Sequence, residues 1–142
     1  VAENLRGKAP DGKVTGSIHM VDSHIRAVNS AKLNIEKNDF DFVTTEVQHN
    51  YELPEGQEKY DVVIGNPPYY ANQRIAEYFI ETASKVLKVG GVIYIVSKHG
   101  TKIETFCEEN CFGKFETQTR KGYDVTKATL LQVPVEGIEE ED

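Results

Sequence analysis

The chain has 142 residues, of which 39% are hydrophobic and 27% charged, which suits one globular domain that buries its own core without a metal or disulfide. No apolar run is long enough to span a bilayer, so no membrane association is expected. The net charge of −7 is largely local, because the last seven residues hold five acids and the rest has 18 acids against 16 bases. We expect one domain over 1–134 and an acidic, disordered tail over 135–142.

Strand-like and helix-like segments alternate along the chain. The first half predicts the end of a helix over 1–9, a turn at 10–12, a strand over 14–21 that ends at Asp22, a helix over 24–37, a strand over 42–46 and a polar loop over 49–57. The second half predicts a strand over 60–65, helices over 73–87 and 101–112, and strands over 92–97, 115–120 and 128–133.

Three of these segments carry more detailed expectations. The strand over 60–65 is continuously apolar, as in strands that helices cover on both faces. The helix over 73–87 is expected to bury one apolar stripe, made of Ile75, Phe79, Ala83, Val86 and Leu87. Gly90 and Gly91 are expected to separate this helix from the next strand, and the last two strands should pair as an antiparallel hairpin.

The order β-α-β-β-α-β-α-β-β predicts an α/β fold: a doubly wound, Rossmann-like sheet, mostly parallel, with an antiparallel C-terminal edge. Such sheets bind ligands at the carboxyl ends of their strands. Asp22, Glu46, Asn66 and the segment after Ser97 all fall at such ends.

The segment Asn66-Pro67-Pro68-Tyr69 directly follows the apolar strand. An amino group conjugated to a ring is a poor nucleophile, and a site activates it by accepting hydrogen bonds from both N–H groups. The Asn66 side-chain oxygen and the Pro67 carbonyl are suited to this, and two successive prolines hold the turn rigid. Tyr69 offers a ring on which a planar base can stack. The alternative is that the prolines merely end the strand.

Asp22 and Ser23 follow the first strand and precede a helix. An acid at this point of a nucleotide-binding sheet commonly binds a ribose hydroxyl, whereas the alternative is that Asp22 or Ser23 caps the helix. The basic side chains that flank strand ends either gather at the rim of the site and meet phosphates or are scattered over the surface: Arg74, Lys98, His99, Lys102, Arg120 and Lys121.

The histidines show no metal-ligand spacing, so no metal is expected. Cys107 and Cys111 are expected to be packed thiols in a reducing, cytoplasmic compartment.

These motifs together resemble the "methyltransferase small" domain of class I S-adenosylmethionine-dependent methyltransferases, which includes RsmC-like enzymes that methylate guanine N2 in ribosomal RNA. The resemblance rests on 61–69, on the glycine-containing segment 87–96, on Gly122-Tyr123, and on 21–28 with Asn34. It implies S-adenosylmethionine as cofactor, held by Asp22, Ser23, Glu46 and Asn66. Glu46 or Gln48 would lie near the adenine, whereas without the Asn66 motif Glu46 is better explained as a solvated loop carboxylate. It implies an RNA substrate, with ribosomal RNA favoured, and a catalytic segment made of Asn66, Pro67, Pro68 and Tyr69.

The chain departs from this family at one place. The family begins with a central strand and a glycine-rich loop for the methionine part of the cofactor, but Gly7, Gly12 and Gly16 show no such spacing. The missing strand would lie between the strand that ends at Asp22 and the strand that ends at Gly65. We therefore expect an N-terminally incomplete domain. The Asn-Pro-Pro-Tyr string also occurs in enzymes that methylate protein glutamine or DNA adenine, and a non-catalytic binding module is a further alternative.

Overall fold

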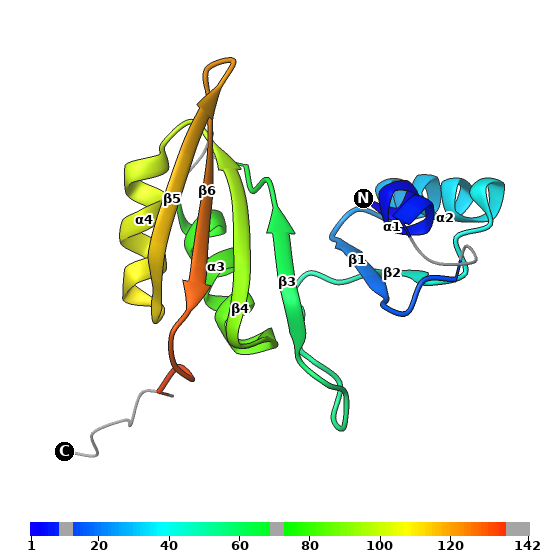
Figure 1. Cartoon of the computed structure of the whole chain (residues 1–142), viewed down its shortest axis with the longest axis horizontal. Coiled ribbons are helices and arrows are strands. Elements are labelled where there is room, and N and C mark those ends of the chain that lie inside the picture. The colour runs from blue at the N-terminus through cyan, green and yellow to red at the C-terminus, as the bar shows by residue number, and fades with distance from the viewer. Residues whose placement is uncertain (9–12, 69–72, 136–142) are drawn as a thin grey trace. The chain divides into compact units, whose positions relative to one another are not determined.

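The computed structural model describes residues 1–8, 13–68 and 73–135. It divides into two compact units, Val1–Tyr51 and Glu52–Asp142, which are considered separately (Figure 1). The expected single domain over 1–134 stays a prediction. The expected acidic tail falls almost entirely on residues 136–142, which lie outside the described residues.

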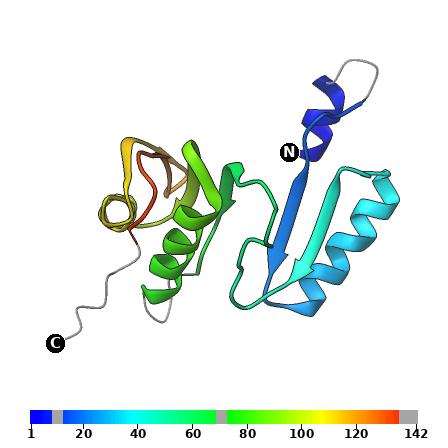
Figure 2. The same ribbon diagram turned by 90° about the horizontal axis from the view of Figure 1, so that it is seen from below.

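The first unit contains a two-stranded parallel sheet. Helix α1 (Ala2–Lys8) precedes strand β1 (Ile18–Asp22), and helix α2 (Ile25–Asn38) connects it to strand β2 (Val43–Val47). The strands pair in parallel from Ile18 opposite Val43 to Asp22 opposite Val47, and α2 covers one face of the pair (Figure 2). Among the described residues of this unit, Val28 and Val43 are the buried apolar side chains.

The second unit holds a four-stranded sheet in the order β3-β4-β6-β5. Its elements are β3 (Tyr60–Gly65), α3 (Arg74–Val86), β4 (Leu87–Ser97), α4 (Gly100–Glu109), β5 (Phe112–Arg120) and β6 (Tyr123–Leu130). Strands β3 and β4 run parallel, and β6 pairs antiparallel with both β4 and β5. This confirms the predicted order of elements, the mostly parallel pairing of the earlier strands and the C-terminal hairpin.

Both α3 and α4 cover the same face of the four-stranded sheet (Figures 1 and 2). Alternate residues of β4 and β6 face these helices, as the two-residue period of a strand requires. One continuous core results, whose fully buried members include Ile80, Ile93, Ile95, Ile103, Ala128 and Leu130. The register of the sheet is therefore set by burial, since a shift of one residue would turn these side chains to solvent.

One expectation about buried faces is wrong, and a second is wrong at one residue. Strand β3 is covered on one face, because Val63 packs on the core whereas the side chains of Val62 and Ile64 are 49% and 59% exposed. Helix α3 buries Ala76, Ile80, Ala83, Ser84 and Val86. Ile75, expected in the buried stripe, is 48% exposed. The other predicted members lie on the buried side, because Ala83, Val86 and Leu87 are buried and Phe79 packs against the core. Ala76 is buried in the first turn, where Ile75 was expected.

Several boundaries also differ. Strand β1 begins at Ile18 rather than at residue 14, and β4 begins at Leu87, so that Gly90 and Gly91 lie within a strand instead of ending a helix. Gly90 has φ 87°, where the β3–β4 register is irregular. Strand β6 was expected over 128–133 but begins at Tyr123. Its buried side chains alternate from Thr126 to Ala128 and Leu130, and the polar threonine hides the start of this pattern in the sequence.

Within the described residues, no helix combines the length and apolar character needed to cross a membrane.

We predict that Ile95→Ala lowers the free energy of unfolding of the second unit by about 2–5 kcal/mol, because it leaves a cavity in a close-packed core. The matched variant Ile64→Ala lies on the neighbouring strand but truncates a side chain that is 59% exposed, so its cost should be below about 0.5 kcal/mol. Urea denaturation followed by circular dichroism measures both. Equal losses would contradict the assignment of the core to the helix-covered face.

Candidate active site

The acceptor segment, residues 66–68, leaves the carboxyl end of β3. Asn66 is exposed and Pro67 is buried, so the proline anchors the turn and the amide is presented to solvent. The ring of Phe79 on α3 lies directly against Gly65, and a Cβ at that position would collide with the ring. Gly65 therefore lets α3 support the strand end next to Asn66. Tyr69 lies outside the described residues.

The sheet register brings three other strand ends to the same edge. Gly65 lies opposite Ile95, and Ser97, the last residue of β4, lies opposite Asp124 near the start of β6. Arg120, the last residue of β5, pairs with Tyr123. The ends of β3, β4 and β5 and the beginning of β6 therefore form one edge of the sheet, which we call the acceptor edge.

Asp124 joins these strand ends to α4. Its Oδ1 accepts a hydrogen bond from the Thr119 hydroxyl at 2.7 Å, and its Oδ2 accepts one from the Gly100 N–H at 3.0 Å. The Thr119 bond first, then the Gly100 bond and the nearby His99, hold the pKa of Asp124 below its ordinary value. A Cβ on residue 100 would lie 2.8 Å from Oδ2, so a larger residue there would displace the Asp124 carboxylate.

Several basic side chains extend from the acceptor edge. This arrangement agrees with the interpretation that they gather at the rim rather than scatter over the surface. Lys98, Arg120 and Lys121 are exposed, and the Lys98 ammonium lies 5.2 Å from the ring centroid of Tyr123. Arg74 and Lys102 lie within or at the start of helices on the covered face.

In the first unit, Asp22 and Ser23 lie at the carboxyl end of β1. The Asp22 Oδ1 accepts a hydrogen bond from the His24 N–H at 2.8 Å, and α2 begins after His24 without a side-chain cap. Asp22 thus shapes the turn into the helix, while Oδ2 remains available for a ligand such as a ribose hydroxyl.

Glu46 lies beside this turn at the end of β2, and both of its carboxylate oxygens are engaged. Gln48 Nε2 donates to Oε1 at 2.8 Å, and His19 Nε2 lies 3.0 Å from Oε2. These two bonds, with Gln48 the larger cause, hold the pKa of Glu46 below its ordinary value. His19 is itself held by Thr44 at 2.7 Å and by the ring of Tyr51. Glu46 is therefore fixed as a charged acceptor, and sequence reasoning missed the histidine that holds it.

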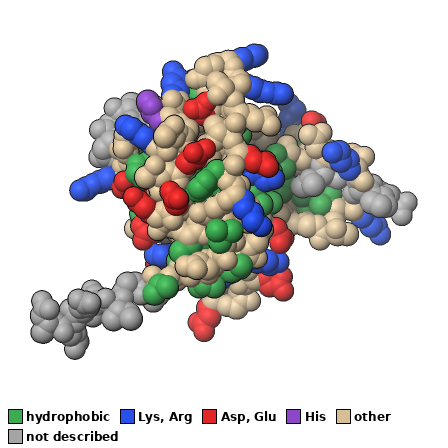
Figure 3. Space-filling model, turned by 60° about the vertical axis from the view of Figure 1, so that its left-hand side comes forward, with side chains coloured by type: hydrophobic (Ala, Val, Ile, Leu, Met, Phe, Trp, Pro, Cys, Tyr) green, Lys and Arg blue, Asp and Glu red, His purple; other side chains and the backbone are tan. Residues whose placement is uncertain are grey.

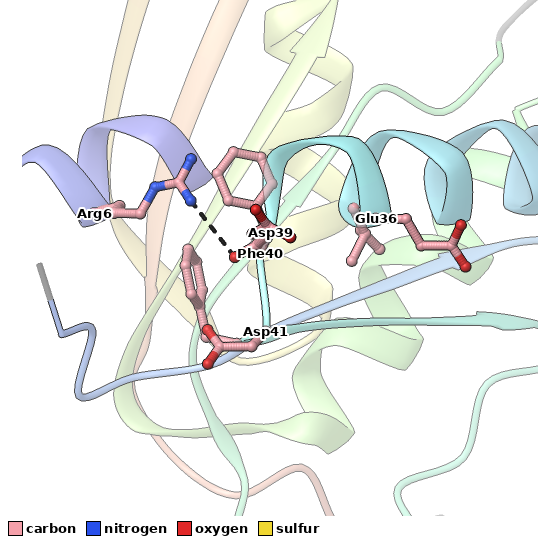
Figure 4. A pocket seen from close by; sticks show the side chains of 7 residues that line it. Arg6, Glu36, Asp39, Phe40 and Asp41 are labelled. Carbon is pink, nitrogen blue, oxygen red and sulfur yellow. Dashed lines mark hydrogen bonds between the residues drawn. The ribbon is translucent and has the colours of Figure 1, made fainter.

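A surface hollow in the first unit lies at the opposite end of β1 and β2, and Arg6 and Phe40 help to line it (Figure 4). The Arg6 guanidinium lies 4.4 Å from the Phe40 ring centroid and donates from Nη1 to the Asn38 carbonyl at 2.6 Å. A cation that bonds the last carbonyls of α2 stabilises the helix end. The hollow is accounted for by this packing.

Within the described ranges, no cluster of three or more His, Cys, Asp or Glu side chains is suited to a metal ion. Cys107 is buried and burial raises the pKa of its thiol to about 12, so it is a packed thiol as expected. Cys111 lies beyond the end of α4 and is partly exposed.

The structure thus gathers one group of predicted residues within each unit. Asn66, Pro67 and Pro68 share the acceptor edge with the basic residues, while Asp22, Ser23 and Glu46 share the carboxyl ends of β1 and β2. The described strands β1 and β3 belong to separate sheets. Asp124 was missed, because nothing in its local sequence distinguishes it from a solvated turn carboxylate.

Residues 7–127 match the family model of the methyltransferase small domain. The chain is 27% identical over 115 residues to the uncharacterized protein YbxB of Bacillus subtilis, covering 79% of this chain and 57% of that protein. It is 30% identical over 96 residues to the ribosomal RNA small subunit methyltransferase C of Shewanella pealeana, covering 64% of this chain and 27% of that enzyme. It therefore spans little more than half of one relative and about a quarter of the other.

Among solved structures, the chain is similar to the 16S rRNA methyltransferase RsmC of T. thermophilus in complex with AdoMet and guanosine. The TM-score is 0.65 and the identity 27%, over 80% of this chain and 31% of that one. TrmN from Thermus thermophilus shares the fold with a TM-score of 0.68 at 14% identity, over 92% of this chain and 40% of that one.

We predict that Asp124→Asn reduces the dependence of stability on acid pH. Because the folded pKa of Asp124 is lowered, its stabilising contribution is fully present above the ordinary pKa of 3.8 and is lost as pH falls through the folded value. The variant should be less stable than the parent near pH 7, and this difference should shrink below pH 3.8.

Urea midpoints measured between pH 7 and pH 2.5 test this expectation. The control is Asp61→Asn, whose carboxylate pairs at the surface with the Lys88 ammonium at 3.3 Å. A difference between parent and Asp124→Asn that stays constant with pH would contradict the role of the charged carboxylate.

Proposed function

Since the chain belongs to the methyltransferase small domain family, we propose that it transfers a methyl group from S-adenosylmethionine to an exocyclic amine, with guanine N2 in ribosomal RNA as the favoured acceptor. The observation that carries this proposal is the acceptor segment at the carboxyl end of β3. There Pro67 is buried, Asn66 is exposed and Phe79 supports the preceding glycine.

The acceptor segment would activate the amine by hydrogen bonding. The Asn66 side-chain oxygen accepts from one N–H and the Pro67 carbonyl from the other, which directs the nitrogen lone pair toward the methyl group. Positioning and fixed dipoles accomplish this without a strong general base. Pro68 keeps the turn rigid, and Tyr69, which lies outside the described residues, is proposed to stack on the base.

Asp22, Ser23 and Glu46 are proposed to hold the adenosine part of the cofactor. These side chains suit the adenosine part of the cofactor, because Asp22 keeps one carboxylate oxygen available and Glu46 is fixed as a charged acceptor at a strand end. When bound, S-adenosylmethionine supplies an electrophilic methyl group. The residues of this chain bind it and orient the acceptor amine.

The RNA substrate is supported by the names of two relatives, a ribosomal RNA methyltransferase and an RsmC structure with bound guanosine. A base that is methylated on its amine must leave the stack or lie in a single strand to reach the acceptor segment. Protein glutamine and DNA adenine present a similar planar amine. Mass spectrometry of the methylated product distinguishes the three acceptors.

A second function is favoured by one observation. The 142 residues contain no glycine-rich G-x-G loop. This favours a non-catalytic module that binds RNA or protein over an enzyme for these residues alone.

We predict that Asn66→Ala lowers methyl transfer at saturating substrate by about 100-fold or more, because one preorganised acceptor is lost. Transfer of a tritiated methyl group from S-adenosylmethionine is measured with a catalytically active form of the protein. The control is Gln118→Ala, which removes an exposed amide from β5. Unchanged turnover in Asn66→Ala would refute the assigned role.

We further predict that residues 1–142 alone bind S-adenosylmethionine more weakly than micromolar. The reason is that these residues contain no glycine-rich G-x-G loop to hold the methionine part of the cofactor. Isothermal titration measures the affinity. A micromolar dissociation constant for this chain alone would overturn the prediction and would disfavour the binding-module alternative.

A further inference from the structure

Four side chains lie together beyond the acceptor segment, and we call Lys98, Arg120, Lys121 and Tyr123 the basic rim. Lys98 follows the end of β4, and the other three form the turn between β5 and β6. Since Ser97 lies opposite Asp124, and Gly65 opposite Ile95, the basic rim shares the acceptor edge with Asn66. Strand β6 lies two strands from β3, a separation of roughly 10 Å.

The turn that carries the basic rim is short and well defined. Lys121 and Gly122 are its two central residues, with φ of 51° and 79°. Two successive positive φ values are typical of the type I′ turn, whose twist matches that of the flanking strands. Asp124 fastens this hairpin to α4 through Thr119 and Gly100. The rim is therefore presented on a rigid support.

The charges of the rim are available to a partner. Lys98, Arg120 and Lys121 form no ion pair with any described carboxylate. Both oxygens of Asp124, the acid next to the turn, already accept hydrogen bonds from the protein. Figure 3 shows Lys and Arg side chains around this end of the second unit, with Asp and Glu side chains on the flank below it.

Tyr123 adds an aromatic surface to this charge. It is 45% exposed, and the Lys98 ammonium lies 5.2 Å from the ring centroid, within the range of a cation–π interaction. Exposed aromatic rings next to basic side chains are how proteins commonly bind single-stranded nucleic acid, with bases on the rings and phosphates on the cations. An acidic peptide would use the charges but would leave the ring without a planar partner.

We propose that the basic rim binds the single-stranded RNA next to the target base, with Lys98, Arg120 and Lys121 meeting phosphates and Tyr123 stacking on a neighbouring base. This inference rests on the proposed function for its substrate class. It adds an RNA-docking surface, distinct from the acceptor segment, that sets how the strand approaches Asn66.

The experiment measures binding of the 142-residue chain to a fluorescein-labelled, unstructured RNA of twelve nucleotides by anisotropy, over a series of salt concentrations. The rim variant combines Lys98→Gln, Arg120→Gln and Lys121→Asn, because asparagine tolerates the positive φ at 121. The matched control combines Lys59→Gln, Lys85→Gln and Lys88→Gln, which remove the same charge from the opposite end of the same unit. Circular dichroism confirms that both variants fold.

We expect the rim variant to lose at least tenfold in affinity at low salt. The slope of log K against log salt should become shallower by about 2, because each phosphate contact on a single strand contributes about 0.7. The control should change affinity by less than about threefold. Equal losses in the two variants would overturn the proposal, as would the absence of RNA binding by the parent chain.

A second variant tests the ring without changing charge. Tyr123→Leu should lower RNA affinity about tenfold with an unchanged salt slope, while Tyr123→Phe should keep most of the affinity. Equal binding of a polyglutamate peptide of the same charge would overturn RNA as the partner in favour of an acidic protein.

Asn66→Ala separates this inference from the proposed function. It should lose methyl transfer but leave the salt slope of RNA binding unchanged, because Asn66 makes no phosphate contact. If the rim variant binds RNA as tightly as the parent while Asn66→Ala abolishes transfer, the rim alone is refuted. If the rim variant loses RNA affinity while Asn66→Ala leaves transfer unchanged, the proposed function alone is refuted.

Discussion

The pairing of β4 with a strand on each side is the constraint on which the acceptor edge depends. Ile93 and Ile95 are fully buried against the helices, and this burial sets the register of β4. Parallel pairing then places the end of β3 beside the end of β4, and antiparallel pairing places the β5–β6 turn at the same edge. Asn66 and the basic rim are therefore neighbours because of apolar packing elsewhere in the sheet.

The two units differ in how much packing supports them. The second unit has a continuous core beneath two helices, whereas in the described part of the first unit Val28 and Val43 are the buried apolar side chains. A small core contributes little free energy, so local bonds matter more there. Arg6 at the end of α2 and the His19–Glu46 pair supply such bonds. The acceptor segment thus has a firmer support than the residues proposed to bind adenosine.

Carboxylates and cations are used differently near the strand ends. Asp22, Glu46 and Asp124 all accept hydrogen bonds from neighbouring protein groups, which fixes their orientation. The cations of the basic rim instead remain without ion pairs among the described residues. Carboxylates held in this way suit the hydroxyl groups of a neutral ligand, whereas cations without ion pairs suit phosphates.

The sequence by itself determined the order of helices and strands, the family, and the position of Asn66-Pro67-Pro68 after a strand, because apolar periodicity and short motifs are local. It did not determine the first turn of the buried stripe of α3, where Ala76 is buried and Ile75 is exposed. Nor did it reveal the start of β6 or the role of Asp124, whose partners Gly100 and Thr119 meet through strand pairing. Those features were decided by tertiary structure, because each depends on a contact between segments that are separate in the chain.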